Sequence, residues 1–250
     1  MKQKRQTFKF SYKVVAAIAI LLVALLVLFP RTDVSAGQEY IHNQETKDTT
    51  KLTKKLATIR KKEIKKAQKE GTLNPFALFD DYVIFGDSRV VGFSSYGYMD
   101  KSRVFADSGN TVRNITEWKK QIKTIRPSNL YFSYGVNDMG LDIDGQEGGY
   151  DVFYEKQVKE MLKYCPKGAK VYINSILPAT PEAVESSPAW KQVNKYNKKI
   201  KKMCKKNGWT YIDNDEITDN GHADIYQEDG VHLISEFYPV WGMNMNESAL

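Results

Sequence analysis

The stretch Tyr82-Val83-Ile84-Phe85-Gly86-Asp87-Ser88 joins a short apolar run directly to a small polar turn. A run of β-branched and aromatic residues that stops at Gly and Asp is typical of a buried strand followed by a turn. In open α/β sheets, functional groups gather at the carboxyl ends of strands. The sequence therefore predicts that Ser88 lies at the edge of a sheet, where a substrate could reach it.

Four more apolar runs of this kind follow, and helical patterns separate them. The runs predict strands at 103–106, 130–134, 171–176 and 209–212. Apolar residues at spacings of three and four predict helices at 111–125, 150–164 and 189–206. Strands that alternate with helices predict an α/β fold with a parallel sheet and helices on both faces.

Three further motifs supply the residue types that a nucleophilic serine needs. They are Gly109, Gly135-Val136-Asn137-Asp138 and Asp229-Gly230-Val231-His232. A serine becomes nucleophilic when an imidazole takes its proton, and a carboxylate must orient that imidazole. Ser88, His232 and Asp229 are the candidates for these roles. The oxyanion of the intermediate needs fixed donors, and the backbone N–H groups of Ser88 and Gly109 and the amide of Asn137 could provide them.

In this order the motifs resemble the SGNH hydrolase family, also called GDSL-like lipases and esterases. The resemblance spans residues 82–232. It implies that Ser88 and His232 are the catalytic Ser and His, that Gly109 and Asn137 serve the oxyanion hole, and that Asp229 completes the triad. It also implies a three-layer α/β/α sandwich with five parallel strands in a flavodoxin-like order. No cofactor or metal is expected.

The base has a rival, because Asp219-Asn220-Gly221-His222 is a second motif of the same form. His232 is favoured because an apolar segment follows it, as in the family's last motif, whereas His222 lies in a polar cluster that is typical of a loop. The third histidine, His42, is expected to be solvated.

The beginning of the chain indicates where in the cell the protein is found. Five basic residues precede an uncharged apolar run at 14–29, so residues 1–36 are predicted to be a signal peptide or a signal anchor. Small residues up to Ala36 allow cleavage there, and an uncleaved anchor is slightly favoured. The basic flank predicts that the remaining chain lies outside the cytoplasm, at the membrane or secreted.

Residues 37–74 are predicted to form a basic helical stalk or linker. Residues 47–70 carry ten Lys or Arg and three acidic residues, with Leu52, Leu56 and Ile59 on one helical stripe. The chain is +7 overall, and because its first thirteen residues carry +5 and this stretch +7, the remainder carries −5. Nucleic-acid binding is therefore not expected. The stalk could attract anionic lipid headgroups or wall polymers, but a solvated spacer is favoured.

Residues 75–250 are predicted to form one catalytic domain. Arg89 could bind an anionic group of the substrate or form a structural ion pair. Tyr134, Tyr96 and Tyr98 could line a rim for sugar stacking, although aromatic residues at strand ends are commonly core.

Two other features of the domain leave alternatives open. Cys165 and Cys204 could pair as a disulfide or remain buried thiols. The glycine-rich, acidic loop at 142–149 suggests a mobile rim, and its spacing does not fit a calcium loop.

Together these features predict a serine esterase that acts on an acylated carbohydrate or small ester, with acetyl groups on cell-surface polysaccharide or peptidoglycan as the expected target. Two alternatives remain. The same acyl-enzyme could transfer its acyl group to a sugar hydroxyl, or the fold could serve a non-catalytic wall-binding protein.

Overall fold

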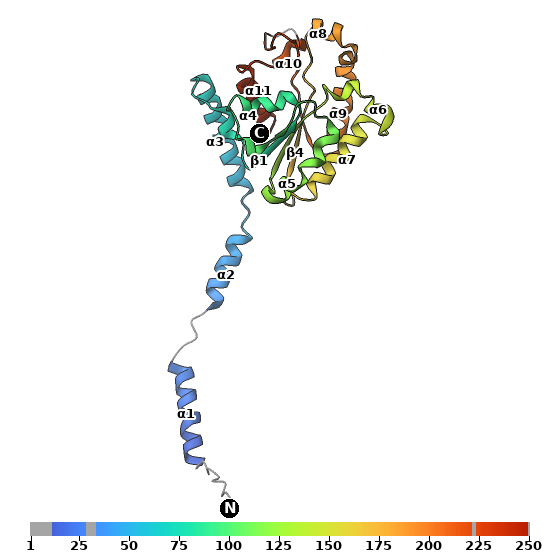
Figure 1. The fold of residues 1–250 in the computed structure, drawn as a ribbon. Coiled ribbons are helices and arrows are strands. Elements are labelled where there is room, and N and C mark those ends of the chain that lie inside the picture. Colours follow the sequence, from blue (N-terminus) through green and yellow to red (C-terminus); the bar gives the residue numbers. More distant parts are fainter. Residues whose placement is uncertain (1–11, 29–33, 222–223, 250) are drawn as a thin grey trace, which may run out of the picture. The chain divides into compact units, whose positions relative to one another are not determined.

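A computed structural model of the chain describes residues 12–28, 34–221 and 224–249. The chain forms two compact units, Met1–Ile59 and Arg60–Leu250. The first contains α1 (Tyr12–Leu28), α2 (Val34–Glu45) and the beginning of α3 (Thr50–Lys69), all labelled in Figure 1. His42 is exposed on α2, as expected.

The predicted signal or anchor falls only partly on described residues, because 1–11 and 29–33 lie outside them. Its apolar run forms α1, which has 17 residues. Among the helices that the structure describes, none has both the length and the apolar character needed to span a membrane.

The second unit is built around a five-stranded sheet. The strands are β1 (Tyr82–Gly86), β2 (Val104–Ala106), β3 (Asn129–Ser133), β4 (Lys170–Asn174) and β5 (Thr210–Ile212). All neighbours pair in parallel, in the order β2-β1-β3-β4-β5. This is the flavodoxin-like order, so the predicted α/β fold class is confirmed.

Helices cover both faces of this sheet (Figure 1). Strand residues alternate between two apolar clusters, because successive side chains point to opposite faces. Val83 and Phe85 pack with α5 (Lys119–Ile125), α7 (Tyr150–Leu162) and α9 (Val193–Asn207). Ile84 packs with α4 (Ser88–Ser95) and α11 (Phe237–Ala249). The result is the predicted three-layer sandwich.

Shorter helices fill the connections. They are η1 (Pro75–Leu78), η2 (Lys101–Arg103), η3 (Val112–Trp118), η4 (Asp138–Gly140), α6 (Ile143–Gln146), α8 (Pro181–Ser186), η5 (Pro188–Gln192), α10 (Asp215–Thr218) and η6 (Asp219–Gly221). The predicted helix at 111–125 is therefore a 3₁₀ segment, η3, that continues into α5. The predicted helix at 189–206 likewise begins as η5 before α9.

The second unit begins within α3, upstream of the domain boundary predicted at residue 75. Ile64 is buried, and the guanidinium of Arg60 donates a 3.4 Å hydrogen bond to the carbonyl of Leu78. The stripe that the sequence pointed to, Leu52, Leu56 and Ile59, is exposed. Burial in this helix thus begins after the predicted stripe, at Ile64.

Cys165 and Cys204 are free thiols in the cluster beneath α7 and α9. Burial raises the pKa of Cys165 to about 11 and that of Cys204 to about 12. Both side chains are therefore protonated at neutral pH and act as core residues. Of the two alternatives, the structure shows buried thiols.

Candidate active site

Ser88 is the first residue of a helix that begins where β1 ends. The side chain of Asp87 caps this helix by accepting a 3.0 Å hydrogen bond from the N–H of Arg89. The first N–H groups of a helix have no partner within it, and the helix dipole makes this end favourable for negative charge. The Ser88 N–H is thus available beside its own half-buried hydroxyl.

A chain of hydrogen bonds joins Ser88, His232 and Asp229. His232 Nε2 lies 3.0 Å from Ser88 Oγ, and His232 Nδ1 lies 2.5 Å from Asp229 Oδ2. These contacts bring together residues that stand 144 positions apart in the chain. The three side chains thus have the connectivity of a nucleophile, a base and an orienting carboxylate.

The backbone holds Asp229 in place. Its Oδ1 accepts hydrogen bonds from the N–H groups of Val231 at 2.9 Å and His232 at 2.8 Å. Partial burial alone would raise the pKa of this carboxyl, but the hydrogen bonds from His232 and from the two N–H groups outweigh it and lower the pKa to about 2. Asp229 is therefore ionised near neutral pH and can stabilise a protonated His232.

Two of the three predicted oxyanion donors lie in the loops that follow β2 and β3. Gly109 is exposed, with a φ of +78° that favours glycine. Asn137 Nδ2 donates to the carbonyl of Asn110, the residue after Gly109, at 2.9 Å. This bond ties the two loops together. Because an amide nitrogen carries two hydrogens, Asn137 keeps a second donor for a substrate oxygen.

Two buried carboxylates support the site, and sequence reasoning assigned no role to either. Asp138 accepts a hydrogen bond from the N–H of Val112 at 2.9 Å, and its second oxygen has no partner among the described residues. Burial raises its pKa to about 7 and that of Asp87, the helix cap, to about 6. Both residues lie inside the quoted motifs, next to Asn137 and Ser88. Their position beside these two residues is the feature of the sequence that could have pointed to them.

Arg89 differs from its predicted role. Its side chain is buried, and it donates to the carbonyls of Val231 at 2.9 Å, Pro178 at 3.1 Å and Leu177. The guanidinium is therefore enclosed by the fold, and no carboxylate lies within ion-pair distance of it in the described part of the chain. Backbone carbonyls satisfy it, and Arg89 instead fixes the loops on which the site rests.

Tyr134 also needs correction. It is almost completely buried in the cluster beneath α7, and its own carbonyl accepts a hydrogen bond from Tyr150 at 3.3 Å. It cannot stack on a substrate at the rim. Tyr96 is exposed and donates to the carbonyl of Leu233, and Tyr98 contacts Ser235. These two tyrosines border the segment that follows His232.

The acidic loop after Asn137 contains a short helix and is tied to α9 by ion pairs. Its middle forms α6, with Ile143 buried, and Asp144 pairs with Lys195 at 3.3 Å and with Lys199. No cluster of three or more potential metal ligands exists in the described ranges. The rival base His222 lies outside the described residues.

The sequence matches the model of the GDSL-like lipase/acylhydrolase family over residues 84–238, more than half of the chain. Comparison with curated proteins gave no match.

Solved structures share the fold. A GDSL-like lipase from Bacteroides thetaiotaomicron is 18% identical, with 75% of this chain and 98% of that chain covered and a TM-score of 0.51. The acetyl xylan esterase AlAXEase is 18% identical, covering 68% and 100%, with a TM-score of 0.50. A catalytic mutant of Axe2, an acetylxylan esterase from Geobacillus stearothermophilus, is 15% identical, covering 67% and 92%, with a TM-score of 0.50. The family match thus agrees with the fold and with the serine, histidine and carboxylate at the edge of its sheet, and the chain belongs to the GDSL-like lipase/acylhydrolase family of serine esterases.

Proposed function

We propose that this protein removes acyl groups, foremost acetyl groups, from polysaccharide or peptidoglycan at the cell surface through an acyl-Ser88 intermediate. The observation that carries the proposal is the hydrogen-bonded series Ser88–His232–Asp229 beside the amide of Asn137. A serine, a base and a ready donor for an oxyanion are the parts that ester hydrolysis needs.

In the first half of the reaction, Ser88 Oγ attacks the ester carbonyl carbon as its proton passes to His232 Nε2, 3.0 Å away. The carbonyl oxygen becomes negative and is held by the N–H groups of Ser88 and Gly109 and by Asn137. Asp229, ionised because its pKa is about 2, stabilises the protonated imidazole. His232 then gives the proton to the sugar oxygen as the bond between that oxygen and the acyl carbon breaks.

In the second half, water replaces the sugar. Its proton passes to His232 Nε2 while its oxygen attacks the acyl carbon of the ester on Ser88. The oxyanion forms again on the same donors. As the bond to Ser88 breaks, His232 returns the proton to Oγ, and the carboxylic acid leaves. The enzyme is restored, and no cofactor enters the proposed steps.

The substrate class rests on two supports. The catalytic groups are open to solvent, because the side chains of His232 and Asp229 are 42% and 47% exposed, so a polymer could reach them without entering a deep channel. Two solved structures of the same fold are described as acetyl xylan esterases. The cell-surface setting rests on the basic and apolar beginning of the chain.

The test incubates the full-length protein and its Ser88→Ala variant with a chromogenic acetyl ester and then with O-acetylated peptidoglycan, and measures released acetate. Release from both substrates by the parent alone is expected. Acetyl groups that move to an added acceptor glycan without release of acetate would favour a transferase. Retention on purified cell walls by both proteins, without turnover of either ester, would favour a wall-binding protein.

A further inference from the structure

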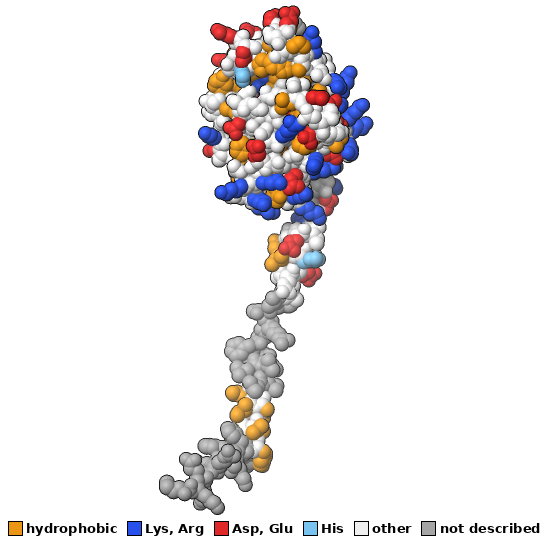
Figure 2. All heavy atoms as spheres, turned by 45° about the vertical axis from the view of Figure 1, so that its right-hand side comes forward, with side chains coloured by type: hydrophobic (Ala, Val, Ile, Leu, Met, Phe, Trp, Pro, Cys, Tyr) orange, Lys and Arg blue, Asp and Glu red, His pale blue; other side chains and the backbone are white. Residues whose placement is uncertain are grey.

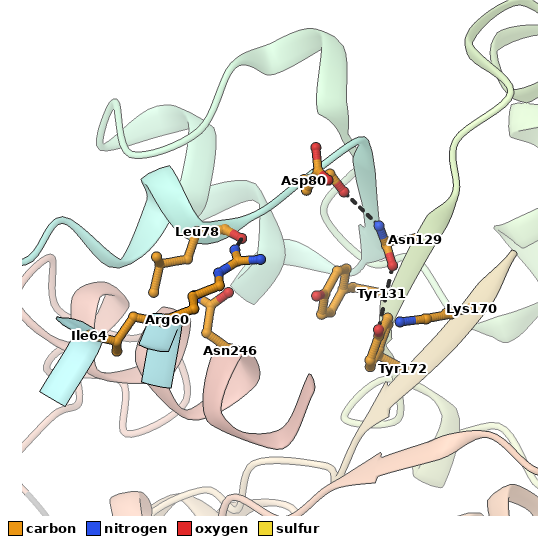
Figure 3. A pocket seen from close by; sticks show the side chains of 9 residues that line it. All are labelled: Arg60, Ile64, Leu78, Asp80, Asn129, Tyr131, Lys170, Tyr172 and Asn246. Atoms are coloured by element: carbon orange, nitrogen blue, oxygen red, sulfur yellow. Dashed lines mark hydrogen bonds between the residues drawn. The ribbon is translucent and has the colours of Figure 1, made fainter. Parts of the chain in front are cut away.

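Three hollows lie next to one another at the edge of the sheet where the strands begin, opposite the edge that carries Ser88. The first, about 140 Å³, lies between α3 and the starts of β3 and β4 (Figure 3). The second, about 490 Å³, lies at the starts of β4 and β5. The third, about 450 Å³, lies between α9 and β5. Lys170 and Tyr172 line both the first and second, and Trp209 lines both the second and third. These shared residues connect the hollows in a row around this edge, from the face covered by α3 to the face covered by α9, and the row is called the basal groove.

Basic residues outnumber acidic ones along this groove. Arg60 and Lys170 approach the first hollow from opposite sides in Figure 3, and a single acidic residue, Asp80, lines it with them. Four lysines of α9 line the third hollow: Lys198, Lys201, Lys202 and Lys205. Figure 2 shows Lys and Arg side chains along the right-hand edge and the lower part of the folded domain. This local charge contrasts with the net negative charge of the chain beyond the basic stretch at 47–70.

Helix α9 carries two kinds of lysine. Lys195, Lys199, Lys201 and Lys206 pair with carboxylates of the domain itself, on Asp144, Asp213 and Glu155. Lys198, Lys202 and Lys205 have no carboxylate within 4.0 Å in the ranges that the structure describes. They stand four and three residues apart on one helix face, where like charges repel and destabilise the helix. An anion in the groove would remove that repulsion.

The groove also offers aromatic surface. Trp209 and Tyr211 are half-buried beneath the lysines of α9, and the ammonium of Lys201 lies 5.2 Å from the centre of the Tyr211 ring. Lys201 thus lies over the Tyr211 ring and 3.5 Å from Asp213. The ring of Trp209 has no such cation over it among the described residues, and it lies between the second and third hollows. A flat apolar ring beside ammonium groups suits a sugar that carries an anionic substituent.

From this arrangement we infer that the basal groove is a non-catalytic binding site for an anionic polysaccharide. Its three linked hollows match an extended chain better than a single small anion. It lies at the edge of the sheet opposite Ser88. It would therefore hold a polymer, or hold the enzyme on a polymer, without taking part in the chemical step. The inference rests on the proposed function only for its setting, since binding itself needs no acyl group.

The test measures binding of full-length protein to de-esterified polygalacturonate. The parent is compared with K198Q/K202Q/K205Q and with the control K120Q/K156Q/K191Q, whose lysines are exposed on α5, α7 and η5 and form no ion pair with a described carboxylate. The groove variant should bind at least about tenfold more weakly, the control should match the parent, and neutral dextran should not bind. All three proteins should hydrolyse a small acetyl ester equally.

Equal binding by the groove variant and the control would overturn the inference, because polymer affinity would then depend on the total charge of the protein and not on this groove. Tighter binding to phosphatidylglycerol vesicles or to single-stranded DNA than to polygalacturonate would also overturn it, in favour of a membrane or a nucleic acid. W209A, checked for an unchanged melting temperature, should weaken binding as well. Because the polymer carries no ester and S88A should bind it normally, failure of this site is distinguishable from failure of the proposed esterase activity.

Discussion

Arg89, the residue after the nucleophile, donates a 2.9 Å hydrogen bond to the backbone carbonyl of Val231, the residue before the histidine. One side chain therefore spans from the helix that presents Ser88 to the turn that presents His232. Its other nitrogens reach the carbonyls of Leu177 and Pro178, after β4. The arrangement of Ser88 and His232 thus depends on a guanidinium that forms no hydrogen bond with either side chain.

Replacing Arg89 by Lys should lower both stability and activity. A lysine keeps the charge but cannot serve three carbonyls at once, so the free energy of unfolding should fall by about 2 to 4 kcal/mol. Because the turn before His232 loosens, kcat/KM for a small acetyl ester should fall about tenfold to a hundredfold. The measurements are urea unfolding and steady-state kinetics. Arg103→Lys, a half-buried arginine just before β2, is the matched control, and a loss of similar size there would contradict this role for Arg89.

Replacing Ser88 by Ala should abolish turnover and leave the fold intact. Ser88 is half-buried at a helix start, where Ala is tolerated, and the cap comes from Asp87. Activity should fall by a factor of about 10⁴ or more, since the remaining groups cannot form the acyl-enzyme. Ester hydrolysis and thermal melting measure the two effects. An active Ser88→Ala protein would reject the assignment of the nucleophile.

Replacing Asn137 by Ala should lower kcat by about 100-fold to 1000-fold with little change in KM. The amide is expected to bind the oxygen that becomes negative, and such donors act mainly on the transition state. A smaller loss of stability should accompany it, because the carbonyl of Asn110 loses its 2.9 Å donor. Initial rates over a range of ester concentrations separate the two parameters. A rise in KM alone would instead indicate a role in substrate binding.

Replacing Asp229 by Asn should lower kcat by roughly 10³- to 10⁴-fold at pH 7, since the amide cannot stabilise a protonated His232. In the parent, the pKa of Asp229 is about 2, so this carboxyl stays ionised above about pH 3. A fall in parental activity between pH 7 and pH 5 should therefore come from another group. Rates from pH 4 to pH 9 measure both enzymes, and an Asp229→Asn enzyme as active as the parent at pH 7 would contradict this role for Asp229.

Replacing Asp138 by Asn should change how stability depends on pH. Its pKa in the folded state, about 7, is above the usual value of about 4, so the folded protein binds more protons between these values. The free energy of unfolding of the parent should therefore fall as pH rises through that window. From pH 4 to pH 8, Asp138→Asn should gain on the order of 1 to 3 kcal/mol relative to the parent.

Denaturant unfolding at several pH values measures this difference. The exposed Asp107→Asn serves as the control. A constant difference between the parent and Asp138→Asn at every pH would show that Asp138 does not titrate in this window.

The strands and the contact between Asp229 and His232 were predictable because both are local signals. Residues 82–85 form an apolar run that only a buried strand explains well, and the turn at Asp229 places its carboxylate on the imidazole three residues later. Helix α4 was missed because it is short and contains Gly92, which appears as a breaker in the sequence. The structure gives the reason for that glycine: a Cβ there would lie 1.8 Å from the hydroxyl of Tyr238.

The misplaced residues depend on contacts between distant segments. Arg89 and Tyr134 both stand next to catalytic motifs, and that adjacency suggested contact with substrate. Whether a side chain points toward solvent or inward depends on the residues that cover it. Leu177 contacts Arg89 and Tyr150 contacts Tyr134, and each belongs to a different element of the fold from its partner. The pKa shift of Asp138 has the same origin, because burial by the whole fold causes it.

The separation of Ser88 and His232 by 144 positions has a consequence for biosynthesis. The strand, the helix and the nucleophile leave the ribosome early, whereas the base and its carboxylate are made later than all five strands. A nascent chain therefore has no functional esterase centre until the segment beyond His232 is available to pack against Arg89 and Gly92.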